Sequence, residues 1–67
     1  MTETISSFEQ ARPGDWLESP VAGGGPPRRG LILEVRGGPG HRRFLVRWDE
    51  EHEAIHYPEP HERLRRE

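Results

Sequence analysis

The clearest strand pattern in the chain is Arg43-Phe44-Leu45-Val46-Arg47-Trp48. Because successive side chains of a strand point to opposite faces, Phe44, Val46 and Trp48 are expected to share one face of a sheet. An acidic turn follows at 49–51, and residues 53–57 have the composition of a second strand. These two segments predict an antiparallel hairpin, and the rest of the fold is expected to pack around it.

Two further strands are expected before this hairpin. Residues 16–18 follow a Pro-Gly-Asp turn, and residues 30–36 form an apolar stretch that ends at a Gly-Gly-Pro-Gly turn. Between them, residues 19–29 contain three consecutive glycines and three prolines, which are incompatible with a helix or a central strand. This segment is therefore predicted to be a long loop.

The apolar run within the stretch 30–36 permits two arrangements. Ile32 and Val35 are three residues apart, so both can face the core only if a bulge lies between them. Without a bulge, Leu31, Leu33 and Val35 share a face instead. The sequence is compatible with either arrangement.

Length and composition restrict the architecture further. The chain has 67 residues, of which 30% are hydrophobic and 33% charged, and it contains no cysteine. This allows one domain with a small core and no disulfides. We predict a mostly β fold, a small antiparallel barrel of four to five strands over residues 13–67. A short C-terminal helical turn is expected at 61–67, docked through Leu64, and residues 1–12 are expected to form a flexible tail or a short helix.

Several segments occur together in an order that is specific as a combination. They are Gly14-Asp15, Arg28-Arg29-Gly30-x-Ile32-Leu33-Glu34-Val35, Leu45-Val46-Arg47-Trp48-Asp49, His52-Glu53 and Tyr57-Pro58-x-Pro60. This combination resembles the bacterial domain-of-unknown-function family 1918, over about residues 13–61. The resemblance implies a Src-homology-3-like small β-barrel with a short C-terminal helix, and it implies no known activity, substrate or cofactor. The chain departs from the family at Glu51, where glycine is common, and in its longer N-terminal segment.

The sequence His52-Glu53-Ala54-Ile55-His56 matches the H-E-x-x-H signature of zinc metalloproteases. That chemistry requires a helix, because only a helix brings both imidazoles to one metal ion. In the expected strand the two histidines lie about 13 Å apart and cannot chelate the same ion. We therefore predict no catalytic residues, no metal site and no cofactor.

Charge is distributed unevenly along the chain, although the formal net charge is only −2 and every base other than histidine is arginine. Residues 28–47 contain six arginines and one acid, whereas residues 49–62 contain six acids and no arginine. One interpretation is a basic patch that binds nucleic acid or an acidic partner. The favoured interpretation is that these acids and bases pair across neighbouring strands, for example Arg43 and Arg47 with Glu53.

The aromatic residues suggest where a partner would bind. Phe44 and Tyr57 are assigned to the core, and Trp48 is expected to be partly exposed beside the acidic turn. The candidate binding residues are Trp48, Arg47, Asp49, His52, Arg28 and Arg29. Small barrels use exposed aromatic side chains to bind peptides or bases.

The sequence as a whole favours a non-enzymatic binding module that recognises another protein or a peptide. The alternative is nucleic-acid binding through the arginines of residues 28–47. No stretch approaches the roughly 18 apolar residues of a membrane span, and the N-terminus lacks a basic and apolar signal pattern. We therefore expect a cytoplasmic protein without a membrane partner.

Overall fold

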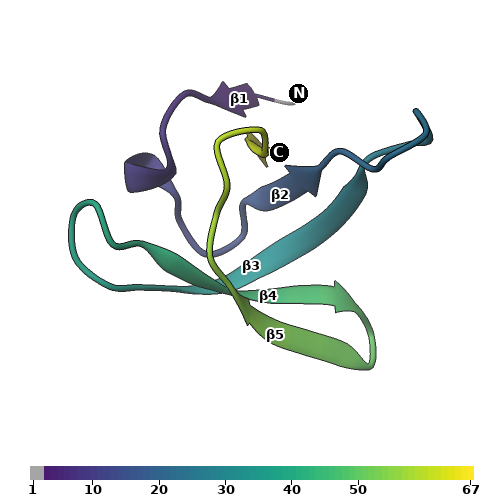
Figure 1. Cartoon of the computed structure of the whole chain (residues 1–67). Coiled ribbons are helices and arrows are strands. Elements are labelled where there is room, and N and C mark those ends of the chain that lie inside the picture. The colour runs from purple at the N-terminus through teal and green to yellow at the C-terminus, as the bar shows by residue number, and fades with distance from the viewer. Residues whose placement is uncertain (1–2) are drawn as a thin grey trace.

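The hairpin predicted from the sequence forms one end of an antiparallel sheet (Figure 1). The computed structural model describes residues 3–67. Its elements are β1 (Glu3–Ile5), the 3-10 helix η1 (Phe8–Gln10), β2 (Trp16–Ser19), β3 (Arg28–Arg36), β4 (Arg43–Asp49), β5 (His52–His56) and β6 (Arg63–Arg66). The six strands form one sheet in the order β1-β6-β2-β3-β4-β5, and each pair is antiparallel.

All four strands expected from the sequence are present as β2, β3, β4 and β5, with bounds shifted by two residues or fewer. The choice left open in β3 is resolved by a bulge. Ile32 pairs with Val46, but the next pair is Glu34 with Leu45, so Leu33 is the extra residue. This insertion lets Ile32, only 1% exposed, and Val35 both pack on the core.

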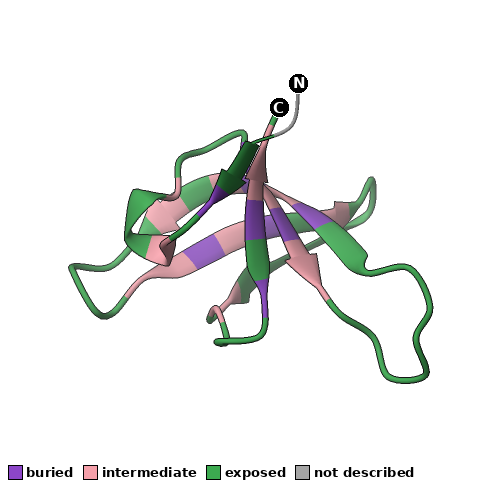
Figure 2. Ribbon diagram, turned by 90° about the horizontal axis from the view of Figure 1, so that it is seen from above, coloured by how far each residue is buried: buried purple, intermediate pink, exposed green. Residues whose placement is uncertain are grey.

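The core lies on one face of the coiled sheet, where buried segments of several strands converge (Figure 2). Its buried members are Ile5, Leu17, Ile32, Phe44, Val46 and Leu64. Phe8 of η1 packs against Phe44 with a ring-centroid distance of 6.3 Å. With so few buried apolar side chains, each one contributes a large share of the stability.

The C-terminal segment corrects one expectation. Residues 63–66 form strand β6 and not a helical turn. The strand lies between β1 and β2, so hydrogen bonding to two neighbours satisfies its backbone, which an isolated helical turn of this length cannot do. Leu64 is buried in register with Ile5 and Leu17, so the apolar anchor was identified correctly although the element type was wrong.

Strand β6 also gives the N-terminal segment a partner. Residues 3–5 pair with residues 64–66, and η1 follows at 8–10. Residues 1–2 of the segment 1–12, expected to be a flexible tail or a short helix, lie outside the described residues. In the described part of the segment, Ile5 and Phe8 pack against the core.

The sheet is open, with β1 at one end of the strand order and β5 at the other. Closure into the expected barrel is therefore not confirmed. The chain beyond β5 runs into Tyr57-Pro58-Glu59-Pro60 and continues to β6, and it is β6, not β5, that pairs with β1. Among residues 3–67 there is no helix long and apolar enough to cross a membrane.

Candidate functional site

The structure does not bring the six candidate binding residues onto one surface. Trp48 and Arg28 lie on the core-facing side of β4 and β3, where Arg28 stacks over the indole. Arg29 and Arg47 alternate with them and therefore lie on the opposite face of the sheet. The remaining two residues, Asp49 and His52, lie at the hairpin turn.

The indole of Trp48 is already in contact with protein groups on several sides. A Cβ atom at Gly30 would come within 2.8 Å of Trp48 Cε3, so the ring packs closely over the glycine. The guanidinium carbon of Arg28 lies 4.1 Å from the ring centroid, and the His56 ring meets the indole edge-on at 5.4 Å. Trp48 is thus partly buried at the rim of the core and partly exposed, as the sequence predicted, with Arg28 over its ring.

A buried carboxylate, not identified from the sequence, lies next to this cluster. Glu62 accepts hydrogen bonds from His56 Nε2 at 2.8 Å and from the backbone N–H of Glu59 at 2.7 Å. Burial by itself raises the pKa of Glu62, but these hydrogen bonds and one from Ser19 outweigh it and hold the pKa below its usual value. Because Glu62 is already engaged by these groups, we interpret the cluster as structural.

The arginines of residues 28–47 are largely paired with acids. Four of the six form ion pairs, with nitrogen–oxygen distances between 2.8 and 3.6 Å: Arg29 with Glu18 and Glu67, Arg36 with Glu34, Arg42 with Glu9, and Arg47 with Glu53. Arg28 stacks on Trp48, and Arg29 also lies over Trp16. The pairing that the sequence favoured is therefore present for Arg47, while Arg43 forms no ion pair with any residue of 3–67.

The hairpin turn is stabilised by its own side chains. Asp49 accepts hydrogen bonds from the backbone N–H of Glu51 at 2.8 Å and pairs with His52 Nδ1 at 2.6 Å. The hydrogen bond from His52, and then that from Glu51, lower the pKa of Asp49. No residue other than glycine has a positive φ in the described chain, so Glu51 adopts an ordinary backbone conformation in this turn. Both candidate residues at the turn thus have a structural explanation.

Strand β5 is the most exposed strand of the sheet. It pairs with β4 alone, and its first four residues are exposed. The prediction that Tyr57 belongs to the core is wrong, because the side chain is 68% exposed. The register pairs His56 with Phe44, so His56 and Ala54 take the core-facing side, and Ile55 and Tyr57 take the other.

We call residues 52–57 the β5 edge surface. Ile55 is 40% exposed, and with Tyr57 and the distant Val21 it makes up the exposed large hydrophobic side chains of the described chain. Two of the three therefore lie within three residues of one another on an unpaired strand edge. Because strand edges and exposed apolar side chains both promote association, this is the candidate functional site.

The histidines of the H-E-x-x-H sequence lie on this strand, as the sequence predicted. His52 pairs with Asp49, and His56 pairs with Glu62. Each imidazole thus contacts a different carboxylate. Within residues 3–67, no group of three or more histidine, aspartate or glutamate side chains is placed to hold a metal ion.

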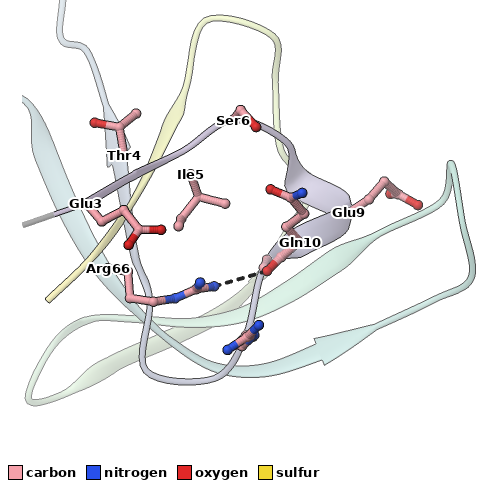
Figure 3. Close-up of a pocket in the computed structure, with 9 residues that line it drawn as sticks. Glu3, Thr4, Ile5, Ser6, Glu9, Gln10 and Arg66 are labelled. Atoms are coloured by element: carbon pink, nitrogen blue, oxygen red, sulfur yellow. Dashed lines mark hydrogen bonds between the residues drawn. The ribbon is translucent and has the colours of Figure 1, made fainter.

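A hollow of about 570 Å³ opens between β1, η1 and β6 (Figure 3). Arg66 of β6 lines this hollow. It donates hydrogen bonds to the Gln10 carbonyl oxygen at 3.1 Å and to both carboxylate oxygens of the buried Asp15. Burial alone raises the pKa of Asp15, but the bonds from Arg66 and from the backbone N–H of Arg12 lower it further than burial raises it. This guanidinium holds the chain ends together and is not free for an anionic ligand.

Comparison with known families identifies the relationship of this fold to other proteins. The sequence pattern of the family described as Domain of unknown function (DUF1918) matches residues 10–63. The chain belongs to this family, as the resemblance indicated. No curated protein and no solved structure matches the chain.

Proposed function

We propose that this chain is a non-enzymatic module that binds another protein, or a peptide segment of one, through the β5 edge surface. The observation that carries the proposal is the exposure of Ile55, on the edge strand β5, together with Tyr57, which directly follows that strand. Burying these two side chains in a complex would remove apolar surface from contact with water without any rearrangement of the core. The proposed setting is the cytoplasm, as expected from the sequence.

The charge distribution favours a protein partner over nucleic acid. Four arginines of residues 28–47 are already neutralised by acids, and the net charge is −2. Nucleic-acid binding draws its affinity from unpaired cations that release counterions from phosphates. Breaking several ion pairs to expose such cations would oppose binding.

Selection of ligands from a random peptide display library tests the proposal. The wild-type protein is expected to retain peptides that bind much more weakly to the double variant Ile55→Ser, Tyr57→Ser. Val21→Ser is the matched control, because Val21 is 42% exposed, close to Ile55 at 40%, but lies in the loop between β2 and β3.

Chemical-shift mapping of a selected peptide on the labelled protein gives the location of binding. The largest shifts are expected in residues 52–57. Selected peptides that bind the double variant as well as they bind the wild type, or shifts centred on the loop around Val21, would contradict the proposal.

A further inference from the structure

The β5 edge surface has a free hydrogen-bonding side as well as exposed side chains. β5 is five residues long and pairs with β4 on one side, and no other strand of the described chain pairs with its other side. No backbone group of β5 is bonded to a turn or loop of residues 3–67. The strand contains neither proline nor lysine, two of the residues with which proteins commonly protect such edges.

The opposite edge of the sheet offers much less. Within residues 3–67, β1 covers three residues, and its Ile5 is buried. Figure 1 shows β1 beside the C-terminus, whereas β5 and its hairpin turn lie at the border of the sheet. An extended ligand therefore finds more unpaired backbone on β5 than on β1.

The charges around β5 define which ligand fits. Glu50 and Glu51 lie in the turn that leads into β5, and neither forms an ion pair with residues 3–67. The other acids nearby, Asp49 and Glu53, are paired with His52 and Arg47. On the neighbouring strand β4, Arg43 precedes Leu45, the partner of Ile55, by two residues. Arg43 therefore lies near the Tyr57 end of β5, away from the turn. The turn end of β5 thus carries an excess of negative charge.

These charges disfavour a second copy of the chain as the occupant. If two β5 strands paired antiparallel about Ala54, each His52 would lie opposite His56 of the other copy, so the β4–β5 turn of one copy would come near the segment that follows His56 in the other. The Glu50 and Glu51 carboxylates in that turn would then approach Glu59 of the other copy. Like charges that face each other across a strand pair destabilise it. A segment with the opposite charge avoids this repulsion.

Building on the proposed function, we infer that β5 accepts an extended, basic segment of another protein as an additional strand of the sheet. Backbone hydrogen bonds to β5 supply the affinity, and alternate apolar side chains of the segment contact Ile55 and Tyr57. An arginine or lysine at the turn end pairs with Glu50 and Glu51. This inference specifies both the binding mode and the charge of the partner.

Fluorescence anisotropy with synthetic peptides tests the inference. The probe is Arg-Arg-Thr-Val-Thr-Val-Thr-Arg-Arg. It has arginines at both ends, so that a basic end lies beside the turn whether the peptide runs parallel or antiparallel to β5. The comparison peptide has glutamate in place of every arginine. At low salt the arginine peptide is expected to bind roughly three- to tenfold more tightly, and the ratio is expected to fall at high salt.

Two variants locate the charge effect. Glu50→Gln with Glu51→Gln is expected to reduce the ratio toward one. Glu3→Gln with Glu67→Gln removes the same formal charge from β1 and the end of the chain, and is expected to leave the ratio unchanged. Equal binding of both peptides to the wild type would overturn the basic partner while leaving a protein-binding role intact.

Backbone methylation tests the binding mode independently. Because alternate N–H groups of an added strand face its neighbour, methylation of one alternate set is expected to abolish binding and methylation of the other set to be tolerated. Equal tolerance of both sets would overturn strand addition.

A concentration-dependent dimer in sedimentation that Ile55→Ser dissociates would overturn the inference in favour of a second copy. If neither synthetic peptide bound while library ligands still bound at residues 52–57, the inference alone would be overturned. If neither the synthetic peptides nor library ligands bound there, the proposed function would be overturned as well.

Discussion

The two edges of the sheet are built from different chemistry. At the β1 edge, the neighbouring β6 contributes Leu64 to the core, and Arg66 ties the strand to the buried Asp15. At the β5 edge, Ile55 and Tyr57 are exposed and the strand contributes no fully buried apolar side chain. The comparison teaches that stability is concentrated at one end of this sheet: one edge completes a minimal core, and the other, where we propose that a partner binds, contributes little to it.

The largest expected difference between the two edges is in core packing. Leu64→Ala should lower the free energy of unfolding by about 2–5 kcal/mol, because it leaves a cavity where the side chain is now 1% exposed. Ile55→Ala should cost less than about 1 kcal/mol, since the side chain is already largely in water. Urea unfolding of both variants measures the difference, and similar losses would contradict the separation.

The second effect concerns the buried carboxylate of the β1–β6 edge. Asp15→Asn should lower the free energy of unfolding by about 1–3 kcal/mol, because it weakens the hydrogen bonds that Asp15 accepts from Arg66 and from the backbone of Arg12. Asp49→Asn, in the exposed β4–β5 turn, is the matched control and should change stability much less. Equal effects in thermal unfolding would show that the two carboxylates are not in different environments.

A third expected effect concerns the packing of β4 side chains against Gly30 of β3. Gly30→Ala should lower the free energy of unfolding by about 1–3 kcal/mol, because the added Cβ would overlap Val46 and Trp48. Gly38→Ala is the control, since a Cβ there meets nothing within 4 Å. A neutral Gly30→Ala variant would mean that Trp48 is free to move away from β3.

Much of the fold follows from the sequence because the strand signals are local. Alternation and the turn residues identified β2 to β5, whereas the separation of Ile32 and Val35 left the bulge as one of two possible arrangements. The strand character of 63–66 was missed, because it depends on two neighbours far away in the chain and Arg63-Leu64-Arg65-Arg66 has helix-forming composition.

The site was harder to predict than the fold. Tyr57 and Ile55 are ordinary core residues by composition, and only the register of β5 on β4 shows that they face solvent. Trp48 is partly exposed, as expected, but the residues that contact its ring, Gly30 and Arg28, come from another strand and are not apparent from the local sequence. Asp15 and Glu62 also accept hydrogen bonds from distant parts of the chain, from Arg66 and Ser19 respectively, so their local sequence gave no signal of these contacts.

The smallest expected effect is the dependence of the free energy of unfolding on pH. In the folded chain the pKa values of Asp15 and Glu62 lie below their usual values, while in the unfolded chain they return to about 4. The unfolded state therefore binds more protons, so the free energy of unfolding should be constant above about pH 5 and should fall as the pH drops through 4. Chemical denaturation at a series of pH values measures this slope. Asp15→Asn should flatten it, and an unchanged slope would contradict the assignment.

Amide hydrogen exchange tests the central claim most directly, that β5 is an open edge and the place where a strand is added. In the free protein, the account predicts that β6 amides exchange slowly, because the strand has a neighbour on each side, and that alternate amides of β5 exchange fast. Addition of the arginine peptide should slow those β5 amides and leave β1 unchanged. Slow exchange along all of β5 in the free protein, or protection at β1 in place of β5, would contradict the account.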